Sequence, residues 1–110
     1  AQMLLDHEAT VSITHAATRD LPAHTRQADI IITAAGVPKL LGADHVTKGA
    51  IIIDVAINRT EAGLVGDADQ AALNGLASVI THVPDGVGPI TTACLFRNIL
   101  AAAQATVSNV

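Results

Sequence analysis

The chain has 110 residues, of which 50% are hydrophobic and 15% charged, and its formal net charge at pH 7 is -4. This size and apolar content predict one folded domain spanning residues 1–110. The six basic residues are scattered, so the clustered positive charge that nucleic acids and anionic membrane surfaces require is missing. No apolar run approaches the roughly 20 residues of a membrane span.

The cysteine content and the opening residues bear on the cellular compartment. Cys94 is the single cysteine of the chain, so an internal disulfide is impossible. The opening residues show no secretory signal pattern. Both observations favour a cytoplasmic protein, because a reducing compartment keeps such a thiol free.

The first third of the chain predicts a helix, a strand and a second helix. Residues 1–9 (AQMLLDHEA) have a helical pattern with no capping residue before it, so the chain is expected to begin inside an element. Residues 10–15 (TVSITH) alternate apolar and polar side chains, which predicts a strand that ends near His15. A short helix is expected to start near Leu21.

Two continuous apolar strands are predicted next. Residues 29–36 (DIIITAAG) and 50–58 (AIIIDVAIN) each hold three consecutive isoleucines. That pattern is typical of strands buried on both faces of a parallel sheet. The segment between them contains a short helical stretch.

The remainder predicts a turn, a short helix, a last strand and a closing helix. Residues 59–69 carry the glycines of a tight turn, and residues 70–77 have a short helical pattern. The last strand is expected at residues 78–83, and the closing helix from near Ile90.

Strands that alternate with helical segments predict an α/β fold with a doubly wound parallel sheet. In such sheets, ligands bind beyond the carboxyl ends of the strands. The candidate binding residues are therefore those that follow each apolar run, in the turns at 15–19, 35–38, 54–58 and 83–92.

The first of these turns bears on the choice between NAD and NADP. Domains that prefer NAD place a carboxylate at the end of the second strand, whereas the NADP 2′-phosphate requires cations there. This chain has His15 and Arg19 and no carboxylate at that strand end, so NADP is the favoured cofactor. The alternative is that Arg19 is a solvated turn residue and His15 a structural hydrogen-bonding group.

The second and third turns are less specific. Ala34, Ala35 and Gly36 leave room for a flat ring system or a ribose near the backbone. Asp54 follows its strand directly and is compatible with an acid, a phosphoacceptor or a turn-forming residue. The favoured interpretation is a carboxylate that accepts hydrogen bonds from loop amides.

The fourth turn precedes the closing helix. Pro89 suits the first turn of a helix, and Gly86 and Gly88 allow a sharp bend before it. The free amides of the helix start, with the hydroxyls of Thr91 and Thr92, form a donor-rich end for an anion, a carboxamide or a carbonyl. The alternative is a purely structural turn from strand to helix.

Four segments together resemble one known family from end to end of the chain. They are ADIIITAAGVP (28–38), KGAIIIDVAINR (48–59), GLVGDAD (63–69) and ITHVPDGVGPITTACLFRNIL (80–100). In order and spacing they are similar to the Rossmann-like nucleotide-binding domain of the bifunctional methylenetetrahydrofolate dehydrogenase/cyclohydrolase. That enzyme oxidises 5,10-methylenetetrahydrofolate with NADP and hydrolyses the methenyl product to 10-formyltetrahydrofolate.

The resemblance implies a role for each matching residue. The backbone of Ile57 is implied to meet the nicotinamide carboxamide, and Thr91 to contact the cofactor from the start of the helix. Gly36 is a further cofactor-binding candidate. The residues at the position of the NADP 2′-phosphate are His15, Ala16 and Arg19. Those at the substrate-side turn are Pro84, Asp85, Gly86, Val87 and Gly88.

The sequence departs from the family pattern at four positions. Asp85 replaces a common second glycine and places a carboxylate beside the cleft of an anionic substrate. Ala16 replaces a frequent serine, which removes one phosphate donor and keeps NAD open as the cofactor. Ala56 stands for a usual glycine, and His82 for a frequent proline.

The family's catalytic lysine and tyrosine belong to an N-terminal domain, and this chain has no tyrosine. Lys39 and Lys48 match no catalytic position, and the glycine-bearing phosphate loop is expected before Ala1. The resemblance therefore implies an N-terminally truncated domain without catalytic residues of its own, inactive when isolated. The family also implies a homodimer.

Two other protein classes share parts of this pattern. A signalling receiver domain would use Asp54 as its phosphoacceptor, but it needs an acidic pair and a lysine that the corresponding strand ends lack. A non-catalytic nucleotide-binding or assembly module remains an alternative. No metal site is predicted, because the histidines share no ligand spacing and Asp67 with Asp69 indicates turn chemistry.

Overall fold

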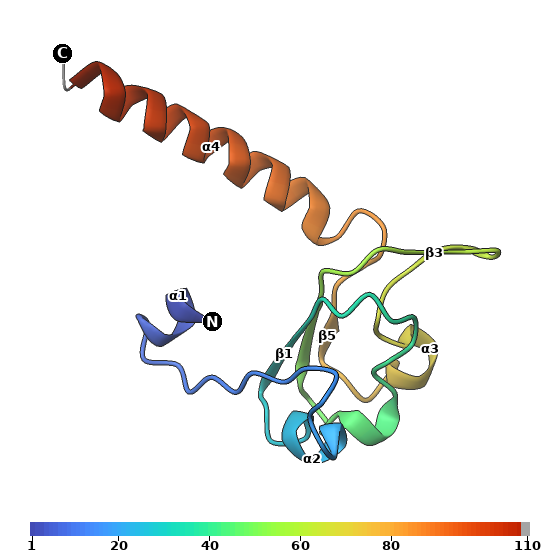
Figure 1. Ribbon diagram of the computed structural model, residues 1–110. Coiled ribbons are helices and arrows are strands. Elements are labelled where there is room, and N and C mark those ends of the chain that lie inside the picture. The colour runs from blue at the N-terminus through green and yellow to red at the C-terminus, as the bar shows by residue number, and fades with distance from the viewer. Residues whose placement is uncertain (109–110) are drawn as a thin grey trace.

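The structure is a computed structural model that describes residues 1–108. Short helices and strands alternate along the chain and are followed by one long helix (Figure 1). The elements are α1 (Gln2–Leu5), α2 (Leu21–Thr25), β1 (Ile30–Thr33), the 3-10 helix η1 (Ala43–His45), β2 (Ile51–Asp54), β3 (Asn58–Thr60), β4 (Gly63–Val65), α3 (Gln70–Leu73), β5 (Val79–Ile80) and α4 (Val87–Ser108).

The centre of the molecule is a parallel sheet with the strand order β1-β2-β5. Ile30 pairs with Ile51, and Thr33 pairs with Asp54, so β1 and β2 end at the same level. Strand β5 joins the other side of β2 with Ile52 opposite Ile80. The predicted α/β fold with a parallel sheet is confirmed.

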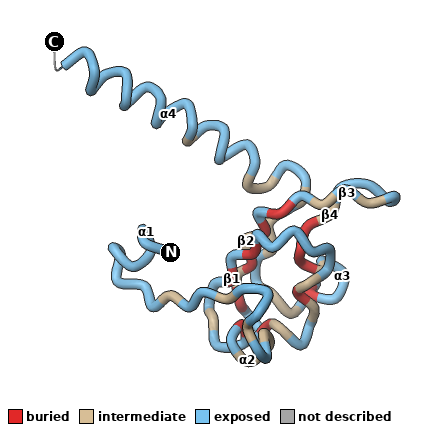
Figure 2. Tube along the Cα trace, viewed as in Figure 1, coloured by how far each residue is buried: buried red, intermediate tan, exposed pale blue. Residues whose placement is uncertain are grey.

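The core lies on one face of this sheet. Ile31 and Ile52 point into it and pack with Leu41, Val46 and Leu73 from the connecting segments. Figure 2 shows the buried residues gathered around β1, β2 and β4.

The opposite face of β1 is exposed, with Ile30 55% and Ile32 54% accessible. The prediction that both isoleucine strands are buried on two faces is therefore wrong for β1. The reason is that the side chains alternate across the strand, and the core cluster covers only one of its faces.

The strand predicted at residues 10–15 is also absent, since this segment has no assigned helix or strand. Its alternating pattern fits a half-buried strand, yet no neighbouring strand pairs with it among the described residues. The helix predicted after it is present as α2. Asp20 caps α2 by accepting a hydrogen bond from the amide of Ala23 at 3.2 Å.

Several elements differ in extent from the prediction, and two of these differences lie next to the candidate binding turns. The second apolar strand ends at Asp54, and Asn58 begins a separate antiparallel hairpin in which β3 pairs with β4. The closing helix α4 begins at Val87, before the predicted start at Ile90, because Gly88 and Pro89 form part of its first turn.

Helix α4 extends away from the sheet and has no buried residue (Figure 1). The Cα radius of gyration is 16.7 Å, against roughly 13 Å for a compact chain of about 100 residues. None of the described helices, α4 included, combines the length and apolar character of a membrane-crossing segment.

Candidate functional site

Three turns leave the carboxyl edge of the parallel sheet. They are residues 34–38 after β1, residues 55–57 after β2 and residues 81–86 after β5. Because the three strands are parallel and in register, these turns lie along one edge. Gly36 and Ile57 are exposed on two of them, with Ile57 60% accessible.

The turn after β1 is organised by the carboxylate of Asp67, which has no solvent exposure. The backbone amides of Ala35 and Gly36 donate to Oδ2 at 2.6 and 3.2 Å, and the amide of Val37 donates to Oδ1 at 2.8 Å. The hydroxyl of Thr33 adds a fourth hydrogen bond at 2.9 Å. Gly36 has a φ of 71°, a conformation that glycine adopts without strain.

The same carboxylate also contacts the turn after β2. The Asn58 side-chain amide donates to Oδ1 of Asp67 at 3.0 Å. Burial raises the pKa of Asp67, but the hydrogen bonds from Asn58, Thr33, Ala35 and Val37 outweigh it, and the pKa lies below its ordinary value. Asp67 is therefore held as the anion at neutral pH.

Asp54 is a second buried carboxylate, 1% accessible, at the end of β2. It accepts hydrogen bonds from the amides of Ala56 at 3.1 Å and Ala68 at 2.8 Å. The interpretation of Asp54 as a carboxylate that binds loop amides is confirmed. Its burial also removes the exposed phosphoacceptor that a receiver domain needs.

The end of β5 is tied to the end of β2 through Thr81. Its hydroxyl accepts from the amide of Asp54 at 2.8 Å, and its own amide donates to the carbonyl of Ile52 at 3.1 Å. This pair of contacts fixes the point at which the chain leaves the sheet for the fourth turn.

The turn after β5 continues into the start of α4, and residues 84–88 are the substrate-side turn predicted from the sequence. The peptide between Val83 and Pro84 is cis, and Asp85 has a φ of 68°. The Gly86 α-carbon lies so close to the His82 carbonyl that a Cβ there would overlap it. The hydroxyl of Thr91 donates to the carbonyl of Val87 at 3.2 Å, within the first turn of the helix.

The turn at residues 15–19 is stabilised by its own hydrogen bonds. The His15 amide donates to the Thr18 hydroxyl at 2.9 Å, and His15 Nδ1 accepts from the amide of Ala17 at 3.2 Å. His15, Ala16 and Arg19 are exposed. Among residues 1–108, no hydrogen bond connects this turn to the sheet edge, so the contribution of these residues to the candidate site stays a prediction.

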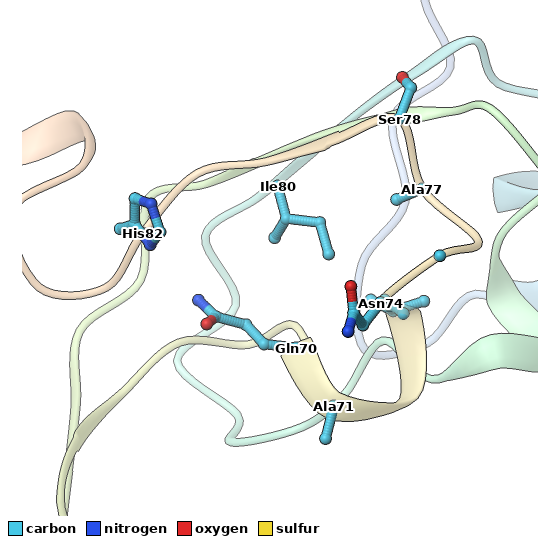
Figure 3. A pocket seen from close by; sticks show the side chains of 9 residues that line it. Gln70, Ala71, Asn74, Ala77, Ser78, Ile80 and His82 are labelled. Carbon is cyan, nitrogen blue, oxygen red and sulfur yellow. The ribbon is translucent and has the colours of Figure 1, made fainter.

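A cavity of about 490 Å³ lies between α3 and β5 and reaches His82 in the turn after β5 (Figure 3). Its polar lining includes Gln70, Asn74, Ser78 and His82, with Ile80 between them. None of the binding residues predicted from the sequence lines it. Within the described part of the chain, no group of three or more His, Cys, Asp or Glu side chains is arranged to hold a metal ion.

Sequence reasoning missed Asp67, Thr33 and Asn58 as organisers of the edge. Asp67 was assigned only to turn chemistry, although a lone aspartate between Gly66 and Ala68 carries no local sign of its distant partners. The available signal was the position of Thr33 and Asn58, which are polar residues at the ends of apolar runs.

Comparison with known sequences identifies the family of this chain. Residues 1–107 match the family described as tetrahydrofolate dehydrogenase/cyclohydrolase, NAD(P)-binding domain. The chain belongs to this family. The resemblance that the sequence motifs indicated is thereby confirmed.

Curated relatives of this family share about half of their aligned residues with the chain. The bifunctional protein FolD of Burkholderia lata is 54% identical over 105 residues, which cover 94% of this chain and 37% of that protein. FolD of Pelagibacter ubique is 51% identical over 100 residues, covering 91% and 36% respectively. The chain thus spans little more than a third of the length of these relatives.

Solved structures of the family share the fold. The bifunctional FolD methylenetetrahydrofolate dehydrogenase/cyclohydrolase of Campylobacter jejuni is 50% identical with a TM-score of 0.91, over 96% of this chain and 38% of that one. The Trypanosoma brucei enzyme, solved with NADP and an inhibitor, is 35% identical with a TM-score of 0.85, over 97% and 39%. The Rossmann-like class of this NAD(P)-binding domain is confirmed.

Proposed function

We propose that the chain is the cofactor-binding part of an enzyme of one-carbon metabolism, a NADP-dependent methylenetetrahydrofolate dehydrogenase and methenyltetrahydrofolate cyclohydrolase. The family match over residues 1–107 carries this proposal. The first reaction moves a hydride from the methylene carbon of 5,10-methylenetetrahydrofolate to the nicotinamide. In the second, water adds to the methenyl carbon, the bond from that carbon to N5 breaks and a proton is released, which gives 10-formyltetrahydrofolate.

The contribution of this domain is orientation of the cofactor. Gly36 and the backbone of Ile57 face the dinucleotide from two turns of the sheet edge, and Thr91 contacts it from the start of α4. The proximity of the turns after β1 and β2, bridged by Asp67, supports this assignment. A nicotinamide held in one geometry makes hydride transfer effectively unimolecular.

The dinucleotide is NADP in this proposal, with NAD as the alternative. His15 and Arg19 supply cationic or hydrogen-bonding groups to the 2′-phosphate, and Ala16 lines the same turn. The exposure of all three residues is compatible with contact to a ligand. A carboxylate that would accept from a ribose 2′-hydroxyl is absent from residues 15–19.

The folate lies against the fourth turn, formed by Pro84, Asp85, Gly86, Val87 and Gly88. The exposed carboxylate of Asp85 repels an anionic substrate and is expected to weaken its binding. The left-handed backbone of Asp85 is compatible with the glycine that relatives commonly have there.

The acid–base chemistry belongs to residues outside this chain. The chain has no tyrosine, and no side chain of the sheet edge is assigned as a general acid or base. Residues 1–110 therefore form a partial domain of a longer enzyme, and the isolated chain is expected to be inactive. The longer enzyme is proposed to be a cytoplasmic homodimer that also supports purine biosynthesis.

A non-catalytic nucleotide-binding or assembly module is the second candidate function. The 22-residue helix α4, which buries none of its residues here, favours a role in assembly. The two functions are separated by the activity of the protein that carries this domain.

The decisive experiment measures the intact mass of the full-length gene product and then assays both of its proposed activities. NADP reduction that depends on methylenetetrahydrofolate, followed by release of 10-formyltetrahydrofolate, is the expected result. A full-length product that binds NADPH but catalyses neither step would favour the assembly module. A product that neither binds NADPH nor reduces NADP would overturn the proposed function.

A further inference from the structure

The turn after β1 presents three consecutive amides to one internal carboxylate. Ala35, Gly36 and Val37 all donate to Asp67. Successive amides in such a turn form a concave site that commonly binds the phosphate of a ligand. Here Asp67 fills that site, so these three amides are not available to a phosphate of the dinucleotide.

The carboxylate also connects this turn to the next one. Asn58, which directly follows Ile57, donates its side-chain amide to Asp67 at 3.0 Å. A Cβ placed on Gly36 would lie 3.9 Å from the Asn58 Oδ1 atom, so the two turns are in close proximity. One buried side chain therefore sets the spacing between Gly36 and Ile57.

Asp67 itself is held by the backbone around it. Its carbonyl accepts from the amide of Leu41 at 3.0 Å, and the amide of Asp69 donates to the Leu41 carbonyl at 2.9 Å. The neighbouring amide of Ala68 donates to Asp54 at 2.8 Å. The carboxylate therefore cannot shift toward solvent without breaking these contacts as well.

From this geometry we propose that Asp67 is a positioning residue for dinucleotide binding, which fixes Gly36 and Ile57 in the arrangement that receives the cofactor. This inference rests on the proposed function, since it assumes that the dinucleotide occupies this edge. Asp67 acts through the turns and touches no ligand atom. Loss of the Asp67 carboxylate is therefore expected to weaken the binding of NADPH and of NADH equally. Loss of a residue that recognises the 2′-phosphate weakens the binding of NADPH alone.

The test compares Asp67→Asn with the wild type in the full-length gene product. Replacing an ionised acceptor that binds five donors is expected to raise the dissociation constants of both dinucleotides about tenfold. Nicotinamide fluorescence measures these constants. Unchanged constants in a folded variant overturn the inference.

Asp69→Ala is the control for loss of stability in the same segment. Asp69 lies two residues away, caps α3 through the amide of Ala72 at 3.3 Å and pairs with the exposed Lys39 at 3.7 Å. Its replacement is expected to lower the thermal midpoint while leaving both dissociation constants unchanged. A loss of affinity that matches that of Asp67→Asn would show that any destabilisation of this segment weakens binding, and would also overturn the inference.

Amide hydrogen exchange provides a readout that does not need the cofactor. The amides of residues 35–37 are expected to be protected in the wild type and to exchange about tenfold faster in Asp67→Asn, with β2 unaffected. If the wild type binds neither dinucleotide while these amides behave as expected, the proposed function has failed and the hydrogen-bond arrangement stands. If the exchange rates of the amides of residues 35–37 are the same in Asp67→Asn and the wild type, the positioning role is wrong.

Thr33→Val is a second variant that tests the same proposal if Asp67→Asn does not fold. This substitution preserves the shape of a side chain that is 7% accessible and removes only its hydrogen bond to Asp67. About a threefold loss of affinity for both dinucleotides is expected. Unaltered affinity together with unaltered exchange at residues 35–37 would contradict the proposal.

Discussion

At the scale of single residues, the sheet edge depends on two buried carboxylates. A charged group without partners is strongly disfavoured in a protein interior. Asp54 and Asp67 are both buried, and each accepts hydrogen bonds from backbone amides of the turns around it. The turns supply the donors that make the burial tolerable, and the carboxylates in return fix the shape of the turns.

The pKa of Asp67 leads to a prediction about acid stability. Because the pKa is lowered in the folded state, the stabilisation is present above the pKa of the unfolded chain and is lost as the pH falls through the folded value. Asp67→Asn is expected to destabilise the fold by about 2 kcal/mol at neutral pH. It is also expected to flatten the decline in stability below about pH 5.

Urea unfolding of both proteins over a series of pH values measures this effect. An acid decline of equal steepness in the variant and the wild type would contradict the prediction. Asp54, the other buried carboxylate of the same edge, remains present in both proteins.

Arg19 provides a test of the cofactor choice. If its guanidinium binds the 2′-phosphate, Arg19→Ala is expected to weaken NADPH about tenfold and NADH less than about twofold, because a charge-assisted hydrogen bond is lost only with NADPH. Fluorescence titration of the full-length gene product measures both affinities. Arg26→Ala is the control, since Arg26 donates to the carbonyl of Asp44 at 2.9 Å in a structural contact. Equal weakening of both dinucleotides would show that Arg19 does not recognise the phosphate.

At the scale of elements, the two glycines between β5 and the first turn of α4 have different surroundings. A Cβ on Gly86 would overlap the His82 carbonyl, whereas nothing lies within 4 Å of a Cβ on Gly88. The first glycine is therefore required by a close backbone approach. The second occupies the first turn of α4, where its main effect is on helix stability.

The paired substitutions Gly86→Ala and Gly88→Ala test this difference. Gly86→Ala is expected to lower the free energy of unfolding by about 2 kcal/mol, since the backbone has to move to admit the methyl group. Gly88→Ala is expected to leave it unchanged or to raise it by up to about 1 kcal/mol. Thermal and urea unfolding measure both values. A similar loss in the two variants would mean that the turn does not make the close approach at Gly86.

At the scale of the whole molecule, apolar surface is exposed on several elements, β1 and α4 among them. Ile30 and Ile32 lie on the uncovered face of β1, and α4 exposes Leu95, Phe96 and Leu100. Contiguous exposed apolar surface marks regions that contact other proteins. It agrees with the proposal that this domain functions within a longer, dimeric enzyme.

This exposure predicts how firmly α4 is held in the 110-residue chain alone. A helix without tertiary contacts has little stability of its own, so the amides of residues 95–108 are expected to exchange at least about a hundredfold faster than those of β2. The same amides are expected to be protected in the full-length gene product. The measurement is amide hydrogen exchange of α4 and β2, made at a protein concentration at which sedimentation shows a monomer. Equal protection of α4 and β2 in the monomer would contradict it.

Local pattern was enough to determine several features of this protein. The isoleucine runs predicted β1, β2 and a parallel sheet, and the alternation of elements predicted the α/β class. These features depend on side-chain periodicity and on residues close together in the chain, which the sequence displays directly. The motifs identified the family for the same reason, because their order and spacing can be read directly along the sequence.

Only the tertiary structure decided which face of β1 is buried, whether residues 10–15 form a strand, and what Asp67 does. A strand exists only where another strand pairs with it, and burial depends on which segments pack nearby. Asp67 lies 34 residues from Thr33 and 9 residues from Asn58. Its role arises because the fold brings these three residues to one edge of the sheet, a proximity that no local pattern in the sequence encodes.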